Sequence, residues 1–77
     1  MLHLRITTPS DLTDQVVGAL SGDPAVSQVA VLAGAAVLPP GDIVLADIAR
    51  EAVNEIMEQL DALGVPQTGT IHAERRG

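Results

Sequence analysis

Two histidines, an arginine and a glutamate stand at alternating positions near the two ends of this chain. His3 and Arg5 lie in the segment MLHLRIT, and His72 and Glu74 lie in the segment GTIHAE. If both segments are strands paired side by side, the alternation places all four side chains on one face of a sheet. Two imidazoles and a carboxylate, from His3, His72 and Glu74, are the ligand types of a metal site or a proton-transfer site. The same spacing also describes the polar positions of two half-exposed strands, because it contains no local pair such as His-x-x-x-His.

A hydroxyl-rich turn follows the first of these segments. Thr7, Thr8 and Ser10 precede a predicted helix, whose first backbone amides can bind an anion or the carboxylate of a metabolite. The alternative is ordinary helix capping, with Thr8 at the N-cap, Pro9 at the first helical position and Asp11 three residues after the cap. The turn is therefore a candidate ligand site or a simple helix start.

The elements that would position these groups follow from the periodicity of apolar residues. Strict alternation predicts a first strand over residues 1–7, and a helical pattern predicts a helix over residues 9–21. The run AVSQVAVL predicts a second strand over residues 26–32, residues 33–41 a loop or bulged turn, and DIVLADI a third strand. An apolar stripe from Ala49 onward predicts a second helix that ends at Gly64, where a left-handed residue is expected, and GTIHAE predicts a fourth strand.

The predicted order is βαββαβ in a single domain over residues 1–77. Right-handed crossovers then favour a ferredoxin-like sandwich, an α+β fold in which two helices cover one face of a four-stranded antiparallel sheet. The first and fourth strands are neighbours in that arrangement. The four polar residues near the chain ends would therefore share the helix-free face.

The third predicted strand has apolar residues on both of its faces. If Asp47 faces away from the helices, Ile43 and Leu45 share the helix-free face with it. The core then takes Val44, Ala46 and Ile48. The alternative is that Asp47 caps the second helix and the two faces are exchanged. Leaving an aliphatic side chain exposed to water loses about 1.5–3 kcal/mol of burial free energy. The total free energy of unfolding of a domain is only roughly 5–15 kcal/mol. We therefore predict a homo-oligomer whose sheets or sheet edges touch, with Ile43 and Leu45 in the interface.

Composition excludes several classes of function. The 77 residues have a net charge of -6 and contain no cysteine, phenylalanine, tyrosine or tryptophan. Negative charge repels nucleic acid, and no aromatic ring is present to stack on bases, so nucleic acid is not a predicted partner. Without thiolates the chain cannot form a soft-metal carrier site. No cofactor is predicted, and no nucleophile–base pair at a usable spacing indicates an enzyme.

Three segments carry a family resemblance. They are TPSDLTDQVVGAL, GDIVLADIAREAVNEIMEQLDALGV and GTIH. Together they resemble the N-terminal domain of the domain of unknown function 389 family, which comprises uncharacterised bacterial membrane proteins, and the likeness covers nearly the whole chain. The resemblance implies a cytoplasmic domain that precedes transmembrane helices, and it supplies no catalytic residues. Because the sequence ends at Gly77 without a hydrophobic region, we expect either an excised domain or a stand-alone relative.

Two functions remain as hypotheses. The first is a non-catalytic regulatory or assembly domain at the cytoplasmic face of a membrane protein, whose partners are further copies of the chain and its own downstream membrane domain. The second is a stand-alone, ACT-like domain that senses an unknown small molecule. ACT-like domains typically use a glycine in the corresponding loop, whereas the loop here holds Thr7, Thr8 and Ser10 and has no glycine. Transmembrane segments encoded after Gly77 would favour the first hypothesis, and a stop codon there would favour the second.

Overall fold

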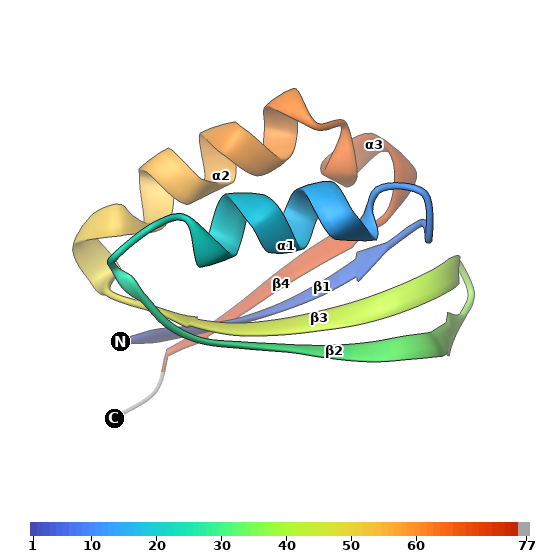
Figure 1. The fold of residues 1–77 in the computed structure, drawn as a ribbon, viewed down its shortest axis with the longest axis horizontal. Helices are drawn as coiled ribbons and strands as arrows, with labels where there is room; N and C mark the ends of the chain where they lie inside the picture. Colours follow the sequence, from blue (N-terminus) through green and yellow to red (C-terminus); the bar gives the residue numbers. More distant parts are fainter. Residues whose placement is uncertain (76–77) are drawn as a thin grey trace.

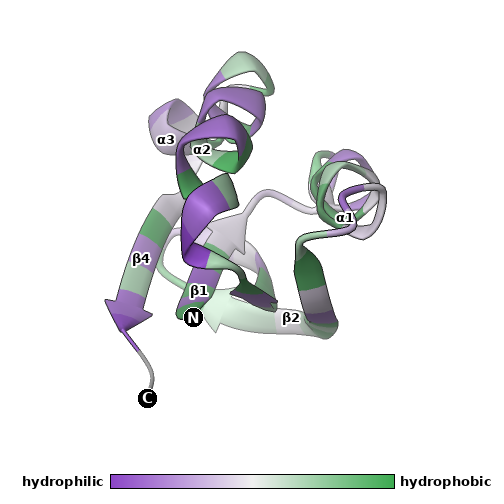
Figure 2. Ribbon diagram, turned by 90° about the vertical axis from the view of Figure 1, so that its left-hand side faces the viewer, coloured by the Kyte–Doolittle hydropathy of each residue, from purple (hydrophilic) through white to green (hydrophobic). Residues whose placement is uncertain are grey.

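The computed structural model describes residues 1–75 and has two layers, a sheet and a layer of helices (Figure 1). The strands are β1 (Leu2–Thr8), β2 (Val26–Val37), β3 (Pro40–Ile48) and β4 (Thr70–Arg75). The helices are α1 (Thr13–Ser21), α2 (Val53–Ala62) and the short α3 (Val65–Thr68), and a 3-10 turn, η1 (Arg50–Ala52), precedes α2. All helices lie on one side of the sheet, so the other face is open (Figure 2).

The four strands form one antiparallel sheet in the order β2-β3-β1-β4. β1 pairs with β3 from Leu2 opposite Ile48 to Thr8 opposite Asp42. On its other side β1 pairs with β4, from Leu2 opposite Arg75 onward. The predicted α+β sandwich with a four-stranded antiparallel sheet is confirmed, and the first and fourth strands are neighbours as expected.

The core lies between the sheet and the helices and is built from aliphatic side chains. Alternate strand residues point into it, as the period of two requires. The strands contribute Leu4, Ile6, Val44, Ala46 and Ile48, all at most 1% exposed. The helices contribute Val16, Leu20, Ile56, Leu60 and Val65, all 0% exposed. The predicted orientation of the third strand is therefore confirmed, and the alternative in which Asp47 caps the second helix is wrong.

The first helix begins later than its sequence predicts. β1 continues through Thr8, which pairs with Asp42 and is buried as a strand residue. A turn closed by the Leu12 N–H and the Pro9 carbonyl oxygen, 2.9 Å apart, then raises the chain from the sheet to the helix layer. α1 starts only at Thr13, and its N-cap residue has no side-chain cap. The prediction of Thr8 as an N-cap is wrong because strand pairing takes that residue first.

The segment predicted as a loop or bulged turn over residues 33–41 is mostly strand and contains a bulge. β2 extends to Val37 and β3 begins at Pro40, so two residues connect them. The pairing is interrupted by a bulge in the second half of β2 and then resumes with Val37 opposite Pro40. Gly34 lies in this bulge with φ of 67°, a left-handed conformation that favours glycine. The open-loop alternative is therefore wrong, and the bulged alternative is the one found, as a bulged hairpin rather than a bulged turn alone.

The second predicted helix is divided into parts. Its first turn is the 3-10 helix η1, and the α-helical part runs from Val53 to Ala62. Gly64 has φ of 83° directly after α2, so the predicted left-handed end is confirmed. The short α3 follows and was not expected, because Val65-Pro66 suggests a stop. Proline is tolerated in the first turn of a helix, and Val65 fills the core there.

Gly69 lies directly before β4 and close against the backbone of β1. A Cβ there would collide with the carbonyl oxygen of Thr7 and lie 3.3 Å from the Cα of Thr8. We expect Gly69→Ala to lower the free energy of unfolding by about 1–3 kcal/mol, as overpacking does. The control is Gly18→Ala in α1, where a Cβ meets nothing within 4 Å. That change should raise the free energy of unfolding by about 0.5–1 kcal/mol. Urea titrations followed by far-UV circular dichroism measure both, and equal effects would contradict the prediction.

Candidate functional site

The open face of the sheet collects the polar side chains that the sequence singles out. His3 lies opposite Glu74, and Arg5 lies opposite His72, in the pairing of β1 with β4. On the other side of β1, Asp47 of β3 lies opposite His3. The predicted convergence of four side chains on the helix-free face is present in the register, and Asp47 joins them.

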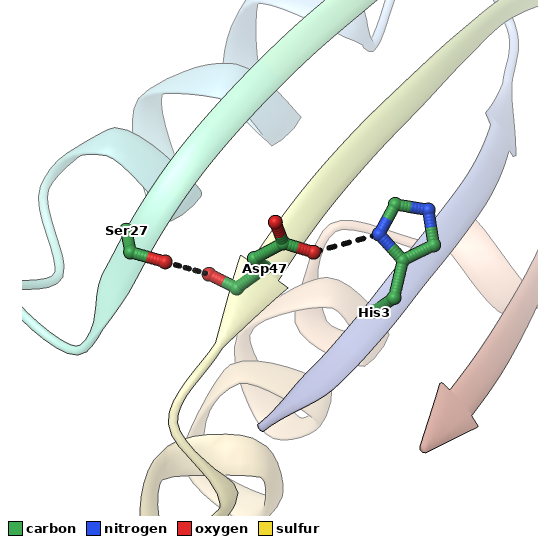
Figure 3. Close-up of polar contacts among 3 residues, drawn as sticks. All are labelled: His3, Ser27 and Asp47. Atoms are coloured by element: carbon green, nitrogen blue, oxygen red, sulfur yellow. Dashed lines mark hydrogen bonds and ion pairs between the residues drawn. The ribbon is translucent and has the colours of Figure 1, made fainter. Parts of the chain in front are cut away.

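His3 contacts Asp47 rather than the residues of β4. Nδ1 of His3 lies 2.7 Å from Oδ1 of Asp47, and the two side chains are only 18% and 17% exposed (Figure 3). Ser27 Oγ donates a hydrogen bond of 3.4 Å to the backbone carbonyl oxygen of Asp47. These contacts tie β2, β3 and β1 together near one end of the sheet (Figure 3). The imidazole is thereby oriented, with only Nε2 left for another partner.

The described side chains do not gather into a metal site. Within residues 1–75 no group of three or more histidine, aspartate or glutamate side chains could hold a metal ion. His72 and Glu74 are exposed on the edge strand β4, whereas Nδ1 of His3 is occupied by Asp47. A zinc-type site needs three or four ligands directed at one point. The metal hypothesis for His3, His72 and Glu74 therefore finds no ligand cluster.

The three hydroxyl residues of the first turn are not brought together. Thr8 is buried on the helix side of β1, and its Oγ1 donates a hydrogen bond of 3.3 Å to the Pro9 carbonyl oxygen. Thr7 lies on the opposite face of the same strand, and Ser10 is exposed in the turn. Neighbouring strand residues cannot aim at one ligand. The anion site predicted from Thr7, Thr8 and Ser10 is not assembled.

A carboxylate that the sequence analysis missed links three elements. Asp42 Oδ2 accepts a hydrogen bond of 2.6 Å from Thr13 Oγ1, and its Oδ1 accepts one of 2.7 Å from the Gly34 N–H. The Thr13 hydrogen bond, followed by the one from Gly34, lowers the pKa of Asp42 because both stabilise the charged form. Asp42 thus ties β3 to the start of α1 and to the bulge in β2. Its partners are 29 and 8 residues away along the chain, so no local motif announces them.

An apolar strip lies beside the charged groups on the open face. Ile43 and Leu45 are half-buried there, and Leu32 of β2, opposite Ile43, is 48% exposed. A shallow hollow of about 380 Å³ runs across this face. It is lined by these three residues together with His3, Arg5, His72 and Glu74. The predicted placement of Ile43 and Leu45 on the helix-free face is confirmed, and Leu32 extends the strip.

Comparisons with known proteins do not add a relative. No family model, curated protein or solved structure matches the chain. In the part of the chain that the structure describes, no helix is long and apolar enough to cross a bilayer. The fold therefore defines the class by itself, an α+β sandwich whose open sheet face mixes charged and apolar side chains.

The contacts of Asp42 predict a pH-dependent contribution to stability. Its pKa is below the ordinary value of 3.8, so its stabilisation is fully present above that value and is lost as the pH falls through the folded-state pKa. Asp42→Asn should therefore destabilise the fold at neutral pH, and the difference from the wild type should shrink toward about pH 2. Urea titrations at both pH values measure the difference, and a constant difference would contradict the prediction. Glu58→Gln, on the exposed face of α2, controls for the loss of one negative charge.

The contact between His3 and Asp47 predicts energetic coupling. We expect a double-mutant cycle with His3→Ala and Asp47→Ala to give about 0.5–1.5 kcal/mol, as for a partly buried hydrogen bond. Arg5 and His72 also lie opposite each other but form no hydrogen bond or ion pair with each other. Their cycle is the control, with a coupling near zero. Equal coupling in the two cycles would show that the contact between His3 and Asp47 adds nothing.

Proposed function

We propose that this chain is a non-catalytic regulatory or assembly domain that joins copies of itself through its sheet. The observation that supports this proposal is the apolar strip of Leu32, Ile43 and Leu45 on the open face, which no described helix covers. Contiguous apolar surface with a polar rim is typical of protein contact sites. Covering such residues removes the penalty of leaving them in water.

The rim of the strip supports a second copy as the occupant. Arg5 and Glu74 line the same hollow with opposite charges but do not form an ion pair with each other. In a twofold contact, if a residue of the first copy touches a second residue in its partner, then the same two residues also touch with the copies exchanged. Arg5 of one copy can therefore face Glu74 of the other, and the reverse pair forms at the same time. Self-association also compensates for a small core that has no disulfide.

The proposal extends to fold class and cellular setting. The strand order β2-β3-β1-β4, the antiparallel pairing and the helices on one face support assignment to the ferredoxin-like class. The resemblance to the domain of unknown function 389 family supports a place at the cytoplasmic face of a larger membrane protein. Contact between these domains would then hold the downstream membrane domains together.

A small-molecule sensor is the second candidate function. The open-face hollow of about 380 Å³ falls within the usual range of about 300–1,000 Å³ for ligand pockets. It presents a guanidinium from Arg5 and a carboxylate from Glu74 beside aliphatic side chains. Thermal-shift screening against amino acids and nucleotides tests this candidate, and a flat screen would count against it.

The assembly proposal predicts the result of a light-scattering measurement at tens of micromolar protein. We expect the wild type to be larger than a monomer and Leu45→Glu to have a lower mass, because a buried charge opposes the contact. Val37→Glu is the matched control, since Val37 is 86% exposed at the end of β2, away from the strip. A monomeric wild type would contradict the proposal. Ile43→Gln repeats the test with a milder change if circular dichroism shows that Leu45→Glu unfolds.

A further inference from the structure

β2 forms the longer of the two edges of the sheet. It has 12 residues and only β3 as a neighbour among the described strands, whereas the opposite edge strand, β4, has 6 residues. Backbone amides and carbonyls along such an edge can pair with a further extended strand. The outer edge of β2 is therefore a surface for strand addition.

β2 lacks most of the features that prevent such pairing. Natural edge strands are usually blocked by charges, by proline or by bulges. The sequence has no charged residue between Asp23 and Asp42, and β2 contains no proline. Its two bulges lie on either side of residues 28–32, which keep an unbroken register with β3. A regular, uncharged segment is left at the centre of the edge.

Side-chain contacts hold this segment in place at both of its ends. Ser27 Oγ donates to the Asp47 carbonyl oxygen just before it (Figure 3). The Gly34 N–H donates to Asp42 just after it, and Thr13 holds the same carboxylate. A strand that is already ordered loses little conformational entropy when another strand pairs with it. Residues 28–32 are therefore a pre-ordered template.

The segment also leaves apolar surface exposed on both faces of the sheet. Val31 is 42% exposed and pairs with the buried Val44, so it lies on the helix side. Leu32 is 48% exposed and pairs with Ile43 on the open face. A strand added at the edge would cover both residues, because its own side chains alternate between the two faces.

We propose that the added strand is β2 of a second copy, antiparallel to the first, so that two four-stranded sheets join into one continuous sheet. This inference rests on the proposed function, self-association through the sheet, and adds an edge contact to the open-face contact proposed above. The contact lies beside β2 and leaves the open face accessible. The two contacts can therefore be tested separately.

The charge distribution supports a second copy over a foreign strand. An antiparallel strand pair satisfies twofold symmetry with the same surface from each chain. Two chains of charge -6 repel each other least where they meet through an uncharged segment. The acidic residues of α2 lie on its exposed face in the other layer: Glu55, Glu58 and Asp61. A neutral edge offers no particular attraction to a charged partner strand.

The lack of cysteine in the sequence allows a direct cross-linking experiment. Single cysteines are placed in turn at residues 28–32 of the full chain, and disulfide formation is followed under mild oxidation. Directly opposite residues of an antiparallel strand pair lie on the same face of the sheet. In a twofold pair of two β2 strands, one residue next to the symmetry axis must therefore lie directly opposite the same residue of the other copy. Their Cα spacing of about 4.5–5.5 Å suits a disulfide. We expect the position at the axis to cross-link about tenfold faster than Glu58→Cys on α2, since effective concentration is higher at a contact.

Each outcome separates this inference from the proposed function. If the wild type self-associates but no position from 28 to 32 cross-links faster than Glu58→Cys, the edge contact is overturned and the assembly function stands. If the wild type is monomeric, the proposed function fails and the edge contact fails with it. Fast cross-linking that persists in Leu45→Glu supports the edge as a contact separate from the open face.

A charge variant provides a second, independent readout. Val31→Lys places like charges near each other across the proposed strand pair, and the dissociation constant should rise by about tenfold. Val37→Lys is the control, because Val37 lies beyond the second bulge and outside the regular segment. Circular dichroism confirms that each variant is folded. Equal effects of the two lysines would overturn the inference.

Discussion

The antiparallel pairing of β1 with β3 is the interaction on which the rest of the structure depends. Its register directs alternate aliphatic residues of both strands toward the helices and sets His3 beside Asp47 on the open side. It also brings Asp42, opposite Thr8, within reach of Thr13 at the start of α1. A slip of one residue would exchange the two faces of each strand. One strand pair thus determines what the two central strands contribute to the core, the link to the first helix and much of the content of the open face.

The core contains no aromatic side chain. Ten buried hydrophobic residues form it, all Val, Leu, Ile or Ala. Each of these buries less surface than an aromatic ring would, so every element has to contribute, including the short α3 through Val65. A domain with this little buried surface gains proportionately more from contacts outside itself. The exposed aliphatic residues of β2 and the half-buried ones on the open face of β3 are surface that such contacts would bury.

Periodicity in the sequence predicts the features that repeat along a single element. The alternation of Leu4 and Ile6, the apolar stripe of α2 and the left-handed Gly64 all lie within one segment, and all are found where expected. The sequence places the start of α1 too early, because Thr8 and Pro9 match a helix cap locally, whereas pairing with a distant strand takes Thr8 into the sheet. Local patterns cannot express such competition between elements.

The polar contacts of the candidate site cannot be predicted from local sequence patterns either, because their partners are far apart along the chain. His3 and Asp47 are 44 residues apart, so nothing in either segment identifies the other as a partner. Alternation predicts the face of the sheet that His3 occupies, but it does not predict that His3 contacts Asp47. The bulge at Gly34 was equally hidden, since its N–H is held by Asp42 across the hairpin. The face that a side chain occupies follows from alternation within its own strand, whereas its contact partner depends on the register between strands.

The hairpin beyond the second bulge has a consequence for how this chain can vary. Residues 33–41 contribute no side chain to the core, and the turn projects past the helix layer (Figure 1). We call residues 33–41 the hairpin arm. Insertions or deletions in this arm would leave the packed layers untouched, provided that they come in matched pairs across the two strands and so keep the alternation of faces. Asp42 and Gly34 mark the base of this arm. The length of this arm can therefore differ between related sequences without a change in the packed sheet and helices.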